Sequence, residues 1–265
     1  MIQVASNYFK GLWHNIVVVM LYTFIYLPIL VLVLFSFNES EVSMSWTSFS
    51  LRWYYLLWNT PELLDSLKVS FIVASASTFS ALFLGVCFVI GSSCWKTDHV
   101  YSLFYLNIIL PDIVLGIGLL TIFNFLHLPL GYGSLIVGHT LLGLGFAIPI
   151  IRARYLELDP VLTEASLDLG ATYIQTMMKV IFPLLIPSLL AAGLIIFTLS
   201  LDDFMISFFC SGPTLQTLSV YVFSMIRTGI DPSINALSTV ILVMSSLLIL
   251  LLSYSKLINR VVSHE

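Results

Sequence analysis

The sequence predicts an all-α membrane protein with six transmembrane helices. Of its 265 residues, 59% are hydrophobic and 9% are charged, and the mean hydropathy is +1.03. Apolar runs of this kind need lipid around them, and one helix needs about 20 such residues to cross a bilayer. No piece between the runs is large enough for a separate domain, so we expect one transmembrane domain over residues 1–265. The predicted spans are 16–37, 67–93, 100–125, 132–151, 184–209 and 234–257.

The first span lies close to the N-terminus, where a signal peptide has to be considered. Lys10 precedes an apolar run from Ile16 to Phe37, whereas the apolar region of a signal peptide holds about 7–15 residues. No small-residue cleavage site follows the run. We therefore expect this segment to be retained as a span.

The second to fifth spans contain several glycines and prolines. Membrane helices tolerate these residues where neighbouring helices satisfy the backbone, and small residues let helices approach closely. The pattern therefore predicts a packed bundle. The residues are Pro111, Gly116, Gly118, Gly143, Gly145, Pro149, Pro187 and Gly193.

Lysines and arginines in the loops predict the orientation, because they collect on the cytoplasmic side. With the N-terminus inside, the outer segments hold only Arg52, Lys68 and Arg227. Both termini are therefore predicted to be cytoplasmic. The inner segments hold Lys10, Lys96, Arg152, Arg154, Lys179, Lys256 and Arg260, and the outer segments collect Glu39, Glu41, Glu62, Asp65 and Asp231.

The outer segments predict two features of the membrane boundary. The loop at 38–66 is rich in tryptophan and tyrosine, whose rings favour the interface between lipid and water. The segment 210–233 is long enough for a short helix at the membrane surface. The rings of the first loop are those of Trp46, Trp53, Tyr54, Tyr55 and Trp58.

Charge, cysteine and histidine patterns argue against several other functions. The formal net charge of −4 gives no support for nucleic-acid binding. Cys87, Cys94 and Cys210 lack metal-like spacing, and the five histidines share no helical face. Neither G-x-S-x-G nor H-E-x-x-H occurs. We therefore disfavour an intramembrane enzyme and expect no catalytic residue and no metal site.

The inner loop at 152–183 begins with a short amphipathic helix. Asp159 can cap the free N–H groups, and Pro160 suits the first helical position. Gly170 is expected to end the helix in a left-handed conformation. An apolar stripe, with two carboxylates beside it, follows at helical spacing. The stripe is Leu158, Leu162, Ala165 and Leu169, and the carboxylates are Glu164 and Asp168.

A second helix is expected directly after Gly170. Thr172 and Gln175 have the spacing of a capping box. Its apolar stripe consists of Ile174, Met177, Met178 and Ile181, and the fifth span is expected to begin directly after Pro183.

The first of these helices is too short to cross a bilayer, because ten residues extend only about 15 Å. It either lies on lipid or inserts into a groove on a soluble partner. Its acidic side chains would be repelled by an anionic membrane surface, which favours the partner. These side chains are Glu157, Asp159, Glu164 and Asp168.

Three carboxylates, Asp112, Asp202 and Asp203, fall inside predicted spans. A charged group at the centre of a membrane helix costs about 2.5–3.5 kcal/mol on insertion scales, so each needs a reason. Either they face a wet cavity as counter-charges for a cationic solute, or they have structural roles. Asp112 would then cap or pair beside Pro111, and the aspartate pair would lie at a wet helix end. We expect His139 to hydrogen-bond a neighbouring helix rather than to relay protons.

The segment E-A-S-x3-G-x9-V-x-F-P, from Glu164 to Pro183, resembles the EAA motif of ATP-binding-cassette (ABC) importer permeases, usually E-A-A-x3-G-x9-I-x-L-P. Ser166, Val180 and Phe182 are conservative departures from that pattern. The resemblance implies a type I importer permease whose cytoplasmic coupling helix docks on an ATPase. It assigns this coupling role to Glu164, Ala165, Ser166, Gly170 and Pro183.

The resemblance extends over residues 12–258 and is to spermidine/putrescine permeases of the PotC type. It rests on LPDIVLGIGLL (110–120), IRARYLELDP (151–160), TLSLDDFMISFFCSGP (198–213) and SMIRTGIDPSINAL (224–237). It implies a subunit of the bacterial inner membrane that works with a second permease, two ATPases and an extracytoplasmic binding protein. No G-x-x-x-x-G-K-S/T loop occurs, so ATP is expected on the ATPase and no cofactor in this chain.

The cargo is the open part of this prediction. Related permeases carry iron, sulfate, phosphate or modified amino acids. The intramembrane carboxylates favour a cation, and no lysine or arginine lies deep in any predicted span. An ion-coupled carrier without an ATPase is a further alternative, although such carriers typically show internal repeats.

Overall fold

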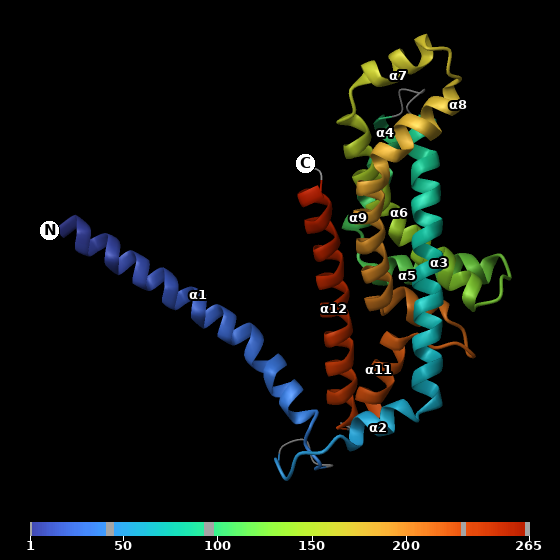
Figure 1. The fold of residues 1–265 in the computed structure, drawn as a ribbon. Helices are drawn as coiled ribbons and strands as arrows, with labels where there is room; N and C mark the ends of the chain where they lie inside the picture. Colours follow the sequence, from blue (N-terminus) through green and yellow to red (C-terminus); the bar gives the residue numbers. More distant parts are fainter. Residues whose placement is uncertain (1, 41–44, 93–97, 229–231, 263–265) are drawn as a thin grey trace. The chain divides into compact units, whose positions relative to one another are not determined.

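A computed structural model describes the backbone of residues 2–40, 45–92, 98–228 and 232–262, and the side chains of 14–40, 45–92, 100–227 and 232–247. Over these ranges helices are joined by turns and irregular segments, and the β-structure is limited to one isolated bridge between Asn38 and Phe49. The helices are α1 Ile2–Phe35, α2 Arg52–Trp58, α3 Pro61–Ser92, α4 Asp98–Ile109, α5 Asp112–Phe125, α6 Tyr132–Leu156, α7 Pro160–Asp168, α8 Tyr173–Thr176, α9 Phe182–Asp202, α10 Met205–Cys210, α11 Leu218–Thr228 and α12 Ser233–Val262 (Figure 1).

Among the described residues, four helical stretches are long and apolar enough to cross a membrane. They correspond to the first, second, fourth and fifth predicted spans, which confirms the class of all-α membrane protein. The stretches are His14–Phe35, Pro61–Ser92, Tyr132–Leu156 and Tyr173–Asp202.

The predicted third span over 100–125 is interrupted by a sharp bend. Val100–Ile109 and Asp112–Phe125 meet at a bend of 113°, so the segment is a broken span or a re-entrant loop. The bend lies at Pro111, which has extended ψ of 134°. Proline lacks an N–H group and disfavours helical geometry in the residue before it. Asp112 is therefore the first residue of α5 rather than the middle of a continuous helix.

The predicted fifth span over 184–209 is also wrong in its bounds. The helical backbone starts earlier, at Tyr173, continues through a π-helical turn at Met177–Ile181 and ends at Asp202. Asp203 is extended, with ψ of 126°, and α10 follows as a separate short helix. The aspartate pair therefore lies at a helix break.

The sixth predicted span corresponds to α12, whose backbone is helical throughout 234–257. Its side chains beyond residue 247 are outside the described part, so the count of six spans stays a prediction. Several residues used above to predict the orientation and to assess the cysteines and histidines also lie outside the described part. The positions outside the described backbone or side chains are Lys10, Glu41, Cys94, Lys96, His99, Asp231, Lys256, Arg260 and His264.

The chain forms two compact units, residues 1–61 with 224–265 and residues 62–223. In the first unit α12 contacts α1 and α2. The indole of Trp53 is 4% exposed and donates from Nε1 to the carbonyl of Asn38 at 2.7 Å. Trp46 and Trp58 are exposed. The aromatic loop therefore contains one buried indole, that of Trp53, and two exposed ones.

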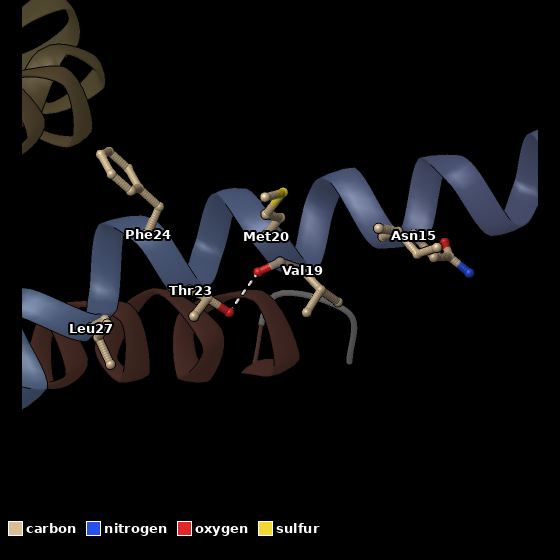
Figure 2. Close-up of a pocket in the computed structure, with 7 residues that line it drawn as sticks. Asn15, Val19, Met20, Thr23, Phe24 and Leu27 are labelled. Carbon is tan, nitrogen blue, oxygen red and sulfur yellow. Dashed lines mark hydrogen bonds between the residues drawn. The ribbon is translucent and has the colours of Figure 1, made fainter.

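Over residues 14–35 the α1 helix carries exposed apolar side chains on all sides. No residue of its span window is buried, and an open groove of about 620 Å³ follows one side of it (Figure 2). The one polar contact drawn there is local, from Oγ1 of Thr23 to the carbonyl of Val19 at 2.8 Å. This helix therefore needs an apolar environment around it, as expected of a membrane span. The groove is lined by Asn15, Ile16, Val19, Met20, Thr23, Phe24 and Leu27.

In the second unit α6 packs on α4 and α9, and α5 packs on α10. Gly143 of α6 allows this close approach. A Cβ atom there would lie 2.8 Å from Cγ2 of Ile196 in α9 and 2.9 Å from Cβ of Ala81 in α3. The predicted packing role is confirmed for Gly143. Gly118 faces open space within this chain.

Candidate functional site

A pocket of about 400 Å³ contains all three carboxylates predicted from the spans, Asp112, Asp202 and Asp203. It is lined by α4, α5, α6, α9 and the segment that joins α9 to α10. Two helix breaks meet here, one before α5 and one after α9. The structure thus brings together residues that are far apart in the sequence.

The rest of the lining is neutral. Asn107 contributes an amide, and none of the described side chains that line the pocket is basic. Apolar surface surrounds the polar groups, as is usual in small-molecule sites. Its larger members are Leu142, Phe146, Leu199 and Phe204.

The two adjacent aspartates have different environments. Asp203 is 9% exposed, and its carboxylate accepts the backbone N–H groups of Ile206 at 3.4 Å and Ser207 at 2.9 Å. It therefore caps the start of α10. Asp202 is exposed and ends α9. A helix C-terminus carries partial negative charge, so this position attracts cations both through the helix and through the carboxylate.

Asp112 is exposed as well, in the first turn of α5. A carboxylate is stabilised at a helix N-terminus, so Asp112 can remain charged while it faces the pocket. Asp112 and Asp202 are thus the two carboxylates that a solute in the pocket can reach.

Behind Asp203 lies a buried polar network around His139 of α6. Nδ1 of its ring lies 2.8 Å from Oγ of Ser200, and Nε2 lies 3.2 Å from Oγ of Ser207 and 3.7 Å from Oδ2 of Asp203. The prediction that His139 hydrogen-bonds neighbouring helices is confirmed. Ser200, Ser207 and Asn107 were not predicted as site residues from the sequence. Each is a polar residue within an apolar span, and this pattern could have identified them.

The coupling segment, residues 152–183, folds as its caps predict. Oδ1 of Asp159 accepts the N–H of Val161 at 2.9 Å at the start of α7. At its end Gly170 has φ of +84°, a conformation that costs little only for glycine. No residue of α7 is buried. The short capped helix is therefore confirmed as local structure.

The capping box of the second helix is also present. Thr172 and Gln175 exchange backbone-to-side-chain hydrogen bonds of 3.3 and 2.9 Å. Oγ of Ser166 lies 2.9 Å from Oγ1 of Thr176, which ties α7 to α8. Of the residues named for coupling, Ser166 is thus partly enclosed. Glu164, Ala165, Gly170 and Pro183 are exposed.

The predicted apolar stripe of the second helix divides in two. Met177 and Ile181 are buried in the core of the second unit. Ile174 and Met178 remain exposed, and so does Leu169, at 89%. Three exposed apolar side chains, called the apolar edge below, therefore follow α7 in the chain.

Solved structures share the fold of this chain. The chain resembles one in a bacterial ABC transporter involved in the import of the acidic polysaccharide alginate, with a TM-score of 0.69 and 11% identity over 95% of this chain and 97% of that one. It also resembles a chain of the MetNI methionine ABC transporter, with a TM-score of 0.59 and 21% identity over 77% and 95%. The fold is that of an ABC transporter permease.

Sequence relatives define the family. The spermidine/putrescine permease PotC of Escherichia coli (strain K12) is 33% identical over 87% of this chain and 88% of its own length. PotC of Haemophilus influenzae is 32% identical over 94% and 97%, and the putrescine permease PotI of Escherichia coli (strain K12) is 32% identical over 87% and 85%. No family model matches the chain. The chain belongs to the PotC/PotI family of ABC transporter permeases and is a multi-pass transport subunit.

Proposed function

We propose that this chain is the permease of an ATP-driven importer for polyamines such as spermidine or putrescine. The observation that carries the proposal is the pocket with Asp112, Asp202 and Asp203 in its wall and no basic side chain among its described lining. The names of the PotC and PotI relatives support the same cargo.

The chemistry of the pocket suits a polyamine. Such a molecule carries ammonium groups separated by methylene chains. Asp112 and Asp202 offer exposed carboxylates for the ammonium groups, and charge-assisted hydrogen bonds of this kind are stronger than neutral ones. Leu142, Phe146 and Phe204 offer apolar surface to the methylenes. Sulfate and phosphate would meet only negative charge here.

Energy would come from partners. We propose that α7 docks on an ABC ATPase through Glu164, Ala165, Ser166 and Gly170. The transporter would hold two ATPases, a second permease related to this one, and an extracytoplasmic binding protein that delivers the solute. The acidic groups of α7 and the exposed apolar edge that follows it in the chain support a protein partner rather than a lipid surface.

A continuous helical stretch would connect the proposed ATPase-docking helix α7 to the pocket that contains Asp202. Residues Tyr173–Asp202 form one candidate span of 30 residues, which is about 45 Å at 1.5 Å per residue. It begins beside α7 and ends at the carboxylate that lines the pocket. A movement of α7 imposed by the ATPase would therefore be transmitted to Asp202. We propose, from the distribution of lysines and arginines, that α7 and both chain termini are on the cytoplasmic side of the inner membrane.

Uptake of labelled spermidine in cells that lack polyamine transport tests the proposal. The cells would express this chain with its companion permease, ATPase and binding protein. Energy-dependent uptake that falls in Asp202→Asn supports both the cargo and the pocket. Absence of uptake, with the complex assembled and its ATPase active, would contradict a polyamine cargo and leave iron and modified amino acids for testing.

A further inference from the structure

His139 is buried beside the pocket without lining it. Its side chain is 1% exposed within α6, and its two ring nitrogens contact serines of two other helices. A buried polar side chain is costly unless it is hydrogen-bonded, above all inside a membrane-spanning bundle. Because both nitrogens have partners, this histidine is held in one defined orientation.

The two serines lie on opposite sides of the break between α9 and α10. Ser200 is in the last turn of α9, Ser207 is in α10, and the extended Asp203 lies between the helices. One rigid imidazole ring on α6 therefore contacts both ends of the break. It fixes the direction in which the chain leaves α9, and hence the place of Asp202, the last residue of that helix.

The carboxylate of Asp203 defines the hydrogen bonding of the ring. Nε2 lies 3.7 Å from its Oδ2. With the proton on Nε2 the ring directs an N–H toward Ser207 and Asp203, and its Nδ1 accepts from the hydroxyl of Ser200. The opposite tautomer would direct a lone pair at the carboxylate. The network continues to α3, where Oγ of Ser77 lies 3.3 Å from Oγ of Ser200.

We propose that His139 is a positioning residue for the cation site. It holds the α9–α10 break in the geometry that places Asp202 in the pocket that Asp112 also lines. The identity of the cation rests on the proposed function above, whereas the geometry of the break does not. His139 acts through Asp203 and the two serines and does not touch the solute.

Three variants separate this role from general packing. His139→Leu keeps similar bulk but loses both hydrogen bonds, whereas His139→Gln keeps an amide that can donate and accept. The control is Thr140→Val, one residue further along the same helix. Thr140 is buried, and its Oγ1 has no hydrogen-bond partner among the described residues, so its loss leaves the network intact.

The first readout is uptake kinetics of labelled spermidine by the assembled transporter. His139→Leu is expected to raise KM about tenfold, as for the loss of buried hydrogen bonds, and to leave the maximal rate within about twofold. His139→Gln and Thr140→Val are expected to stay close to the parent. A fall in maximal rate with unchanged KM would overturn the proposal.

The second readout needs no cargo. Met205, which lines the pocket just after the break, is replaced by cysteine in a chain whose Cys87, Cys94 and Cys210 are alanine. The rate of its reaction with a small water-soluble thiol reagent is then measured in the complex. His139→Leu should change this rate severalfold, and Thr140→Val should not.

The two readouts keep the two proposals apart. If the parent complex takes up no polyamine, the proposed cargo fails and the cysteine reaction alone decides about His139. A changed rate in His139→Leu would still support the positioning role. Equal rates in the parent, His139→Leu and Thr140→Val would overturn it whatever the cargo is.

Discussion

Asp112 and Asp202 line one pocket because each lies where a helix is interrupted. Asp112 follows the 113° bend between α4 and α5, and Asp202 ends the long helix that begins at Tyr173. Interrupted helices at membrane depth are tolerated where they line a cavity rather than face lipid. The two helix breaks and the two carboxylates inside predicted spans therefore have one common explanation, namely that they line a cavity.

The adjacent aspartates should respond differently to substitution. Asp202→Asn removes an exposed charge, so the melting temperature of the purified complex should stay unchanged while KM for spermidine rises. Asp203→Ala removes the cap of α10, which typically costs about 0.5–2 kcal/mol, and should lower the melting temperature. Thermal unfolding of both variants, followed by uptake assays, gives the comparison.

Equal destabilisation by the two substitutions would contradict this division of roles. Asp65→Asn is the matched control for removal of a carboxylate. Asp65 is exposed and pairs with Lys68 at 3.0 Å on the surface of α3. Such surface pairs contribute only about 0–1 kcal/mol, so neither uptake nor melting should change.

Gly170→Ala should impair coupling without impairing insertion. The φ of +84° at this position requires glycine, and a Cβ in the left-handed region costs about 1–2 kcal/mol. Relief of that strain would displace the end of α7, so transport-coupled ATP hydrolysis should fall. Gly133→Ala, at a glycine with ordinary φ and open space around it, should behave as the parent. Normal transport by Gly170→Ala would argue against docking through α7.

Glu164→Lys should weaken the association with the ATPase. The side chain is exposed on α7 and borders a small pocket of about 320 Å³ that Tyr155 and Ile181 also line. Reversal of its charge changes any charge complementarity with a partner. The check is the amount of ATPase that copurifies with the permease. If as much ATPase copurifies with Glu164→Lys as with the parent chain, docking through this side chain would be contradicted.

Gly143→Leu should disrupt the helical bundle. A Cβ at Gly143 would already lie within 3.0 Å of Ile196 and Ala81, and overpacking of this kind typically costs about 1–3 kcal/mol. Gly118→Leu introduces the same side chain into open space and should leave stability unchanged. Thermal unfolding of the two variants in detergent measures the difference, and equal stability would contradict the packing of α6 on α9.

The coupling segment could be predicted closely from sequence because its signals are short-range. Asp159 and Thr172 cap helices through hydrogen bonds within three residues, and Gly170 meets a purely local backbone requirement. The division of its apolar stripe could not be predicted. Burial of Met177 and exposure of Met178 depend on where the rest of the bundle packs.

The pocket could be predicted only in part. Hydropathy identified the three costly carboxylates, but it cannot distinguish a straight span from one bent at Pro111. The presence of Asp112 and Asp202 in one pocket depends on the packing of α5 against α10, a long-range contact without a local signal. The network of His139 with Ser200 and Ser207 depends likewise on long-range packing, here of α6 against α9 and α10.

ATP-dependent uptake into proteoliposomes tests the central claim most directly. The purified complex, with its binding protein and labelled spermidine, is compared with complexes that carry Asp112→Asn together with Asp202→Asn, or Asp65→Asn as the control. The account predicts uptake by the parent and the control, and loss of uptake in the double variant while its ATPase activity remains. Full uptake by the double variant would contradict a role for these carboxylates in the path of the cation.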